Sequence, residues 1–359
     1  MIITPGEFYE TAQTLESFKE SDFVNPIQTE VIRTEDIFTE FSSGLKDPAA
    51  IRNFIRYANM NWVTDTTDIP EYIMLFGDGS YDYRNLELAN YSNSIPTFQG
   101  SANNDIASRA ADNFYVAINN TNGVSSLQPE LAIGRIPVNN LAEAENYISK
   151  LIKYDRSYAF TPESQNGWQS VLTFVADDEC PANRACTEWF HLRQTEEIVN
   201  LLPEKFDVKK IYLTDYETET GGLGRLKPKA TTDLLNQINR GTLFINFYGH
   251  GDPNTWAHEQ VLTRGRDLPF INNDGRLPIW VAATCTWGQY DDPNTPSMAE
   301  AVIWNSGGGI ASIAASRPTF AFANERFVEN MFDDLFRDGS NTKRSITIGD
   351  AILPALDGT

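Results

Sequence analysis

The sequence predicts an α/β protein with largely parallel sheets and helices on both faces of each sheet. Two observations lead to this prediction. Short apolar runs rich in β-branched and aromatic residues recur along the chain, and amphipathic stretches with helical periodicity lie between them. Such alternation is typical of parallel sheets, because parallel neighbours need a long crossover between them. The predicted strands are residues 71–77, 130–136, 170–176, 206–214, 241–249, 277–284 and 308–315.

The predicted helices fill the intervals between these runs. In the first of them, Leu141, Ala144, Ile148 and Leu151 share one face. The N-terminal 65 residues are less regular, with helix-like pieces at 7–20 and 47–60 and a polar strand candidate at 27–33. The remaining helices are expected at residues 141–155, 187–202, 230–239, 297–305 and 322–336.

A domain boundary is predicted where the pattern breaks. The segment 157–168 is polar and contains Pro162 and Gly167. We therefore expect two α/β subdomains, residues 1–160 and residues 165–359, each with its own largely parallel sheet.

The charge balance limits the kinds of partner. The chain has 28 Lys and Arg against 49 Asp and Glu, a net charge of −21. This excess repels nucleic acid and anionic membrane surfaces. No apolar run approaches the roughly 20 residues of a membrane-spanning helix, so no direct membrane insertion is expected. The first residues do not resemble an export signal, which leaves a cytoplasmic protein or a fragment of a longer exported one.

The three cysteines differ in their surroundings. Cys180 and Cys186 are close together in a loop segment and could pair in an oxidising compartment, whereas Cys285 stands alone. An odd thiol is a candidate reactive group, and a small buried apolar residue is the alternative.

The best candidates for chemistry follow two of the predicted strands. Ligands bind parallel sheets beyond the carboxyl ends of the strands. His250 lies there between two glycines, and Cys285 directly follows the run WVAAT. The residues between them, 251–284, are enough for a parallel crossover, so the two strands could be neighbours. A thiol beside an imidazole is a common source of thiolate at neutral pH. A strand-capping histidine and a buried cysteine remain the alternatives.

Other chemistries are disfavoured. The sequence has no serine-hydrolase elbow, phosphate-binding glycine loop, dinucleotide fingerprint or zinc-peptidase motif. Of the three histidines, His191 lies in a helical pattern, where a packing or supporting role is expected, and His258 lies in a polar loop. No spacing suggests a zinc site.

The strings NFYGHGDPNTW and LPIWVAATCTWGQYDDP resemble the histidine and cysteine blocks of the gingipain-type cysteine peptidases, which have a caspase-like fold. Four flanking strings resemble, more closely, the PorU-type sortases of the type IX secretion system. They are YIMLFGDGSYDYRN, ELAIGRIPV, FVADDEC and GGGIASIAASRP. The resemblance runs from about residue 70 to the end, and more weakly from residue 1.

The resemblance implies roles for individual residues. Cys285 matches the nucleophile and His250 the catalytic histidine, and the amides of Gly251 and Cys285 match the oxyanion hole. Asp178 matches the acid that orients the histidine, with Asp177 as an alternative. The candidates for substrate binding are Glu188, Tyr248 and Trp287.

The resemblance also implies a cellular context. It suggests a cysteine endopeptidase acting on proteins or peptides, associated with the cell surface or outer membrane or secreted. Other components of a secretion apparatus are then expected partners. Hydrolysis and transfer to an amine acceptor are both open, and a catalytically silent scaffold is the alternative. No cofactor is required; calcium is conceivable as a structural ion at GDGSYDY or DDP, where ordinary acidic turns are the alternative.

Overall fold

A computed structural model describes ten stretches of the chain. They are residues 1–22, 26–62, 69–86, 95–100, 108–119, 127–159, 167–178, 189–222, 224–336 and 346–356. The chain forms two compact units. Unit 1 comprises Met1–Ile152, Tyr290–Thr295 and Ile348–Gly358, and unit 2 comprises Lys153–Gln289 and Pro296–Thr347. No helix in the described stretches is long and apolar enough to cross a membrane.

Unit 1 is built on a parallel four-stranded sheet in the order β2-β1-β3-β4. Its strands are β1 (Ile2–Thr4), β2 (Val31–Arg33), β3 (Tyr72–Phe76) and β4 (Ala132–Ile136). The core brings Ile3 and Leu75 of the sheet together with Ile51 and Ile55 of a helix. The helices are η1 (Gly6–Phe8), α1 (Tyr9–Glu20), α2 (Thr34–Ser42), α3 (Pro48–Asn61), α4 (Asn113–Val116), α5 (Leu141–Ala159) and α11 (Ile348–Ala355), and α5 continues into unit 2.

Unit 2 is built on a parallel five-stranded sheet in the order β13-β12-β9-β5-β6. Its strands are β5 (Val171–Ala176), β6 (Asp207–Tyr212), β9 (Phe244–Tyr248), β12 (Ile279–Ala283) and β13 (Ala311–Ala314). Every residue of β9 and β12 is buried, as expected of strands with neighbours on both edges and helices on both faces. Two short antiparallel pairs lie outside this sheet, β7 (Glu219–Gly221) with β8 (Gly224–Leu226) and β10 (Thr255–Trp256) with β11 (Leu262–Thr263).

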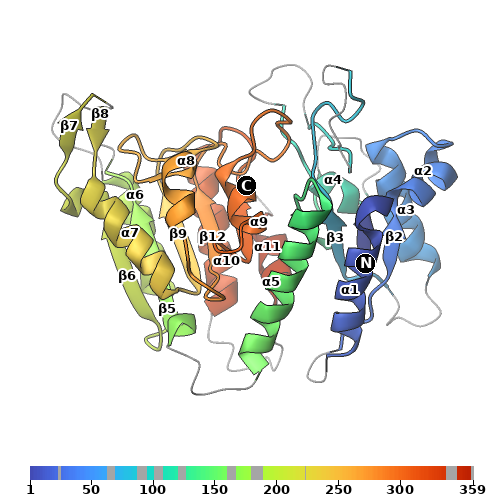
Figure 1. Cartoon of the computed structure of the whole chain (residues 1–359), viewed down its shortest axis with the longest axis horizontal. Coiled ribbons are helices and arrows are strands. Elements are labelled where there is room, and N and C mark those ends of the chain that lie inside the picture. The colour runs from blue at the N-terminus through green and yellow to red at the C-terminus, as the bar shows by residue number, and fades with distance from the viewer. Residues whose placement is uncertain are drawn as a thin grey trace. The chain divides into compact units, whose positions relative to one another are not determined.

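Helices cover both faces of this second sheet (Figure 1). On one face α6 (Phe190–Leu201) packs against α10 (Ala321–Phe336), and Phe332 of α10 contacts Phe174 and Phe244 of the sheet. On the other face α7 (Pro228–Arg240) buries Leu234 and Ile238, one helical turn apart. The remaining helices are α8 (Arg264–Asp267), α9 (Met298–Trp304), η2 (Trp168–Ser170), η3 (Leu213–Asp215) and η4 (Leu268–Phe270).

All seven strands and five helices predicted from periodicity are present, with ends shifted by a few residues. The strand candidate at 27–33 is β2, and the helix-like pieces at 7–20 and 47–60 are α1 and α3. Two of the elements that were not predicted are β1 and α2. β1 has only three residues, too few for a periodic pattern, and α2 follows β2 without a turn signal. The division at residues 1–160 and 165–359 stays a prediction.

Candidate active site

His250 stands at the carboxyl end of β9, where its main chain is held by Asp177. The amide of Asp177 donates to the Tyr248 carbonyl (2.9 Å), and the His250 amide donates to Oδ2 of Asp177 (3.0 Å). Gly249 makes this contact possible, because a Cβ at that position would lie 2.6 Å from the Asp177 Cβ. The main chain before the imidazole is therefore fixed, while the side chain is exposed.

Gly251 combines a close approach with an N–H group that lies outside the adjacent hydrogen-bond ladder. A Cβ here would lie 2.6 Å from Oγ1 of Thr284 and 3.0 Å from the Thr255 carbonyl, so only glycine fits. Gly251 pairs with Trp256, but the hydrogen bonds flank the pair, from Asp252 to Thr255 and from Ala257 to His250. Gly251 is thus in a non-hydrogen-bonded position of this antiparallel bridge, and its N–H takes no part in the ladder.

Cys285 follows β12, the parallel neighbour of β9. The register places Ala283 opposite Tyr248, so the cysteine and the histidine each follow this pair by two residues. This confirms that the two strands are neighbours. Thr286 has φ of +51°, a left-handed conformation that costs free energy for a β-branched residue and often marks functional sites. Within the described stretches, the Cys285 amide has no hydrogen-bond acceptor.

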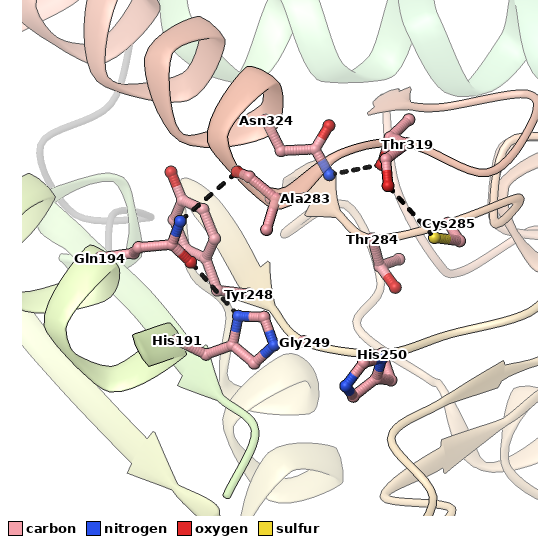
Figure 2. Close-up of a pocket in the computed structure, with 11 residues that line it drawn as sticks. His191, Gln194, Tyr248, Gly249, His250, Ala283, Thr284, Cys285, Thr319 and Asn324 are labelled. Atoms are coloured by element: carbon pink, nitrogen blue, oxygen red, sulfur yellow. Dashed lines mark hydrogen bonds between the residues drawn. The ribbon is translucent and has the colours of Figure 1, made fainter. Parts of the chain in front are cut away.

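His250 and Cys285 line the same pocket (Figure 2). The half-buried thiol points toward the Thr319 carbonyl, with Sγ and O 3.8 Å apart. Among the described residues, no hydrogen bond joins the thiol to the imidazole. Catalytic hydrogen bonds are often absent or long without substrate, and here the thiol has a local acceptor instead. The other lining residues are His191, Gln194, Tyr248, Gly249, Ala283, Thr284, Thr319, Ala321 and Asn324.

The three histidines of the chain lie together at this site. The ring of His191 meets that of His250 edge-on, with centroids 5.6 Å apart, and His258 lies 5.0 Å from His250. Nδ1 of the buried His191 is 3.2 Å from Oε1 of Gln194. A packing or supporting role was expected for His191, whereas His258 was expected only in a polar loop. The rarity of histidine was a usable signal, because the chain has only three histidines and all three lie at this site.

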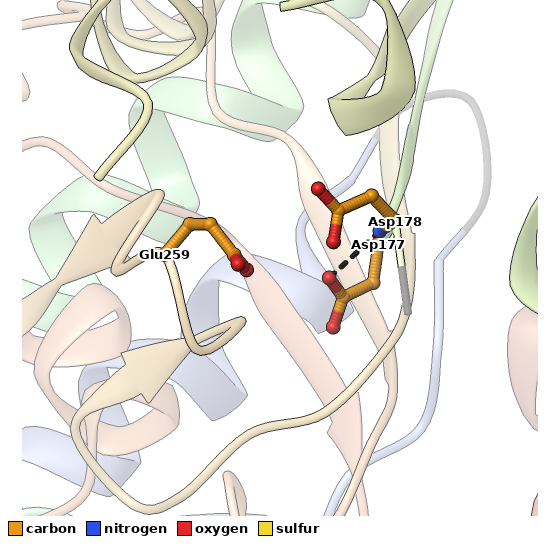
Figure 3. Close-up of side chains that lie close together, drawn as sticks. All are labelled: Asp177, Asp178 and Glu259. Atoms are coloured by element: carbon orange, nitrogen blue, oxygen red, sulfur yellow. Dashed lines mark hydrogen bonds between the residues drawn. The ribbon is translucent and has the colours of Figure 1, made fainter. Parts of the chain in front are cut away.

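The two candidate orienting acids lie next to each other (Figure 3), but they have different partners. Asp177 accepts from the main chain of Asp178 and of His250. The Asp178 carboxylate lies 3.1 Å from Nζ of Lys227 and 3.6 Å from the guanidinium of Arg225. Within the described stretches, neither carboxylate is hydrogen-bonded to the His250 imidazole. Asp178 as the orienting acid stays a prediction, and the structure places Asp177 against the His250 main chain.

Glu259 joins this acidic group, which sequence patterns did not reveal. It is buried, pairs with Arg225, and offers an oxygen within 4.8 Å of oxygens of Asp177 and Asp178. Such a trio could hold a metal ion. However, Arg225 pairs with Asp178 and Glu259, and the buried Lys227 pairs with Asp178, so cations of the chain itself already meet two of the three carboxylates. Calcium at the GDGSYDY or DDP segments stays a prediction.

The candidate substrate-binding residues fall in three different places. Tyr248 is buried and lines the pocket, and its hydroxyl has no partner among the described residues. Burial, together with the charge of Glu325, raises the pKa of Tyr248 well above its usual range, so its hydroxyl keeps its proton. Trp287 is fully buried between Trp256 and Trp280, from where it can support the site without touching substrate. Glu188, Cys180 and Cys186 lie outside the described residues.

Comparison with known proteins supports the architecture. The model of peptidase family C25 matches residues 1–357. The crystal structure of the Arg-specific cysteine proteinase gingipain R (RgpB) is 20% identical with a TM-score of 0.71, covering 99% of this chain and 71% of that one. The complex of the Porphyromonas gingivalis RgpB pro- and mature domains gives 19% identity and 0.69, covering 99% and 72%. The predicted gingipain-type fold is thus confirmed.

A third structural match is only partial. Dimeric latent PorU from Porphyromonas gingivalis is 22% identical over 50% of this chain and 20% of that one. Its TM-score is 0.36, so the likeness does not extend to the whole fold. No curated protein sequence matches the chain.

Proposed function

Because the chain belongs to peptidase family C25, we propose that it is a cysteine peptidase with Cys285 as nucleophile and His250 as general acid and base. One observation supports this pair above all others. Two adjacent central strands, paired in register, end beside one pocket, and the cysteine and histidine occupy equivalent places after those strands.

The proposed mechanism uses groups of the described site. The thiol loses its proton to His250, and the thiolate attacks the carbonyl carbon of the scissile peptide. The amides of Gly251 and Cys285 donate to the oxyanion. His250 then gives the proton to the leaving amine, and a thioester with Cys285 remains. Water, or an amine acceptor, attacks the thioester and restores the thiol.

The acidic group supports the histidine in this proposal. Asp178 remains the proposed orienting acid and Asp177 the alternative. The two carboxylates also make different contacts. Asp177 holds the His250 main chain, and Asp178 neutralises Lys227 and Arg225.

More specifically, the peptidase we propose is a sortase. Its support is the resemblance of the strand-end segments to PorU-type enzymes, which implies removal of C-terminal signals from cargo proteins at the cell surface, with secretion components as partners. The RgpB relative is described as Arg-specific. Glu188 is the acid we propose for selecting the residue before the scissile bond here.

A thiol-directed peptide probe tests the peptidase proposal. A library of peptidyl acyloxymethyl ketones should label the wild-type protein at one cysteine, which peptide mapping identifies as Cys285. The Cys285→Ala variant should remain unlabelled, and His250→Gln should label far more slowly. Equal labelling of wild type and His250→Gln would contradict the proposal and favour a scaffold, in which the Thr319 carbonyl simply holds the thiol.

A further inference from the structure

The loop that carries Cys285 leaves unit 2 and later returns to it. Unit 2 runs as far as Gln289, Tyr290–Thr295 belongs to unit 1, and unit 2 resumes at Pro296. Four residues, 286–289, therefore separate the proposed nucleophile from a segment that is packed in unit 1. Because so few residues intervene, a displacement of this segment acts directly on the loop that carries the thiol.

Asp291 is held inside unit 1 by its side chain and by its main chain. The side chain is fully buried, and its Oδ2 accepts a hydrogen bond from Nε2 of Gln99 (2.9 Å). The Asp291 carbonyl accepts from the amide of Tyr81 (2.9 Å). A buried carboxylate that loses a donor is costly, because no water replaces the lost hydrogen bond. These contacts therefore fix the chain at Asp291.

Tyr290 is packed in the same part of unit 1. The guanidinium carbon of Arg135 lies 5.0 Å from the centre of the Tyr290 ring, within the range of a cation–π contact. Arg135 is itself held by two hydrogen bonds of 2.8 Å to Asp112. Gly79 leaves room for the ring, since a Cβ there would lie 3.0 Å from Cε2 of Tyr290. We call Tyr290 and Asp291 the anchor.

The loop between Cys285 and the anchor contains a strained residue. Thr286 has φ of +51°, a conformation that persists for a β-branched residue only where the surroundings impose it. Within unit 2 the loop is held by hydrogen bonds from Gly288 to the Ala315 carbonyl and from Gln289 to the Thr286 carbonyl, both 3.0 Å. The anchor begins directly after Gln289. Its release would let Thr286 relax, and Thr286 directly follows the nucleophile.

We propose that Tyr290 and Asp291 are positioning residues, which hold Cys285 in its reactive place from within unit 1. This inference rests on the proposed peptidase function, because the position of the thiol matters for turnover only if the thiol reacts. The returning chain is fixed too, since Ser297 and Glu300 form a reciprocal cap at the beginning of α9. Unit 1 therefore contributes to turnover, although the proposed catalytic residues lie in unit 2.

The variant Gln99→Glu tests the anchor from a position far from Cys285 in sequence. Its new carboxylate would face that of Asp291, and two buried carboxylates repel each other. We expect kcat with a cleavable peptide and the alkylation rate of Cys285 at pH 6 to fall roughly tenfold, because a small misplacement of a reacting group slows a reaction at least this much. Gln99→Leu, which removes the donor without adding a charge, should lower both rates as well.

A double variant and a control separate positioning from general destabilisation. Gln99→Glu combined with Asp291→Asn exchanges donor and acceptor across the same pair, so it should restore most of both rates. Ile55→Val is the matched control, because Ile55 is fully buried in the core of unit 1 and that core includes neither anchor residue. It should lower stability and leave both rates of the folded protein unchanged.

Hydrogen exchange follows the loop without any chemistry at the thiol. The amides of Gly288 and Gln289 should exchange faster in Gln99→Glu than in the wild type, and normally in the double variant. Unchanged rates in Gln99→Glu, with or without faster exchange, or an equal loss of rate in Ile55→Val, would reject the anchor and leave the peptidase intact. Faster exchange in Gln99→Glu alone, together with an inert wild-type protein, would retain the anchor and reject the proposed chemistry.

Discussion

Gly251 shows how closely the main chain at this site is packed. Its missing Cβ leaves room for Oγ1 of Thr284, the residue just before Cys285, and its N–H stays outside the neighbouring ladder. The main chain of Gly251, which follows β9, is therefore packed against the side chain of Thr284, which follows β12. Such an arrangement keeps donors in place before substrate arrives, which is how an oxyanion hole stabilises a transition state.

The Gly251→Ala substitution should therefore lower kcat by roughly a hundredfold, because the new methyl group would displace one oxyanion donor. Gly265→Ala is the matched control, since a Cβ at Gly265 meets nothing within 4 Å. Steady-state kinetics with a cleavable peptide gives the comparison. An unchanged kcat in Gly251→Ala would remove this amide from the mechanism.

Asp177 and Asp178 should respond differently to the same change. Asp177→Asn should lower turnover with a small loss of stability, because one of its two accepting oxygens becomes an amide group facing an N–H. Asp178→Asn should lower turnover, because the proposed orienting acid is lost, and should also lower the free energy of unfolding by about 3 kcal/mol, because Lys227 would stay buried with its charge no longer matched. Denaturant titration and peptide cleavage of both variants distinguish the two roles. Normal turnover in Asp178→Asn would contradict Asp178 as the orienting acid and favour Asp177.

At the scale of elements, the sequence was informative where packing enforces a period. The central strands β9 and β12 are buried throughout and apolar except for Asn246, and α7 repeats an apolar residue each turn. Short elements were not predicted. For example, β1 has only three residues and is defined by its neighbours β2 and β3. Their ladder partners are distant in sequence, and local patterns carry no information about them.

Helix α5 contains a buried lysine that makes stability depend on pH. Burial lowers the pKa of Lys150 to about 7 in the folded protein, whereas the unfolded chain has the ordinary value of 10.5. Between pH 7 and pH 10 the unfolded state therefore binds more protons at this side chain, and its contribution to stability rises with pH.

Comparison with Lys150→Met isolates this effect from other titrating groups. The free energy of unfolding of the wild type, minus that of the variant, should rise by up to about 1.4 kcal/mol per pH unit across this range. Denaturant titrations at pH 7, 8, 9 and 10 measure it. A difference that stays constant with pH would contradict the effect of burial on Lys150.

At the scale of the whole molecule, the sequence placed the histidine and cysteine correctly at one sheet edge but could not resolve their surroundings. The strand-end rule and the crossover length were enough to predict neighbouring strands, which the register of β9 and β12 confirms. The roles of Asp177, Glu259 and His258 depend on which side chains turn inward from loops. That choice is made by tertiary contacts, such as the pairing of Glu259 with Arg225 from β8, which leave no trace in local spacing.

The cysteine content predicts the compartment. In an exported protein Cys180 and Cys186 should form a disulfide, leaving Cys285 as a single free thiol. Counting thiols on denatured, unreduced protein taken from its native host should give one. A count of three would show that the pair is reduced and would remove this support for export.

The alkylation rate of Cys285 tests the central claim most directly. A simple thiol has a pKa near 8.5 and is scarcely ionised at pH 6, whereas a neighbouring imidazolium keeps a catalytic cysteine as thiolate. Cys285 should therefore react with iodoacetamide at pH 6 at least roughly tenfold faster than a free thiol such as N-acetylcysteine. His250→Gln should lose that advantage, while the control Phe270→Ser, which replaces an exposed residue that does not line the pocket, should keep it. Equal rates in the wild type and in His250→Gln would contradict the catalytic pair.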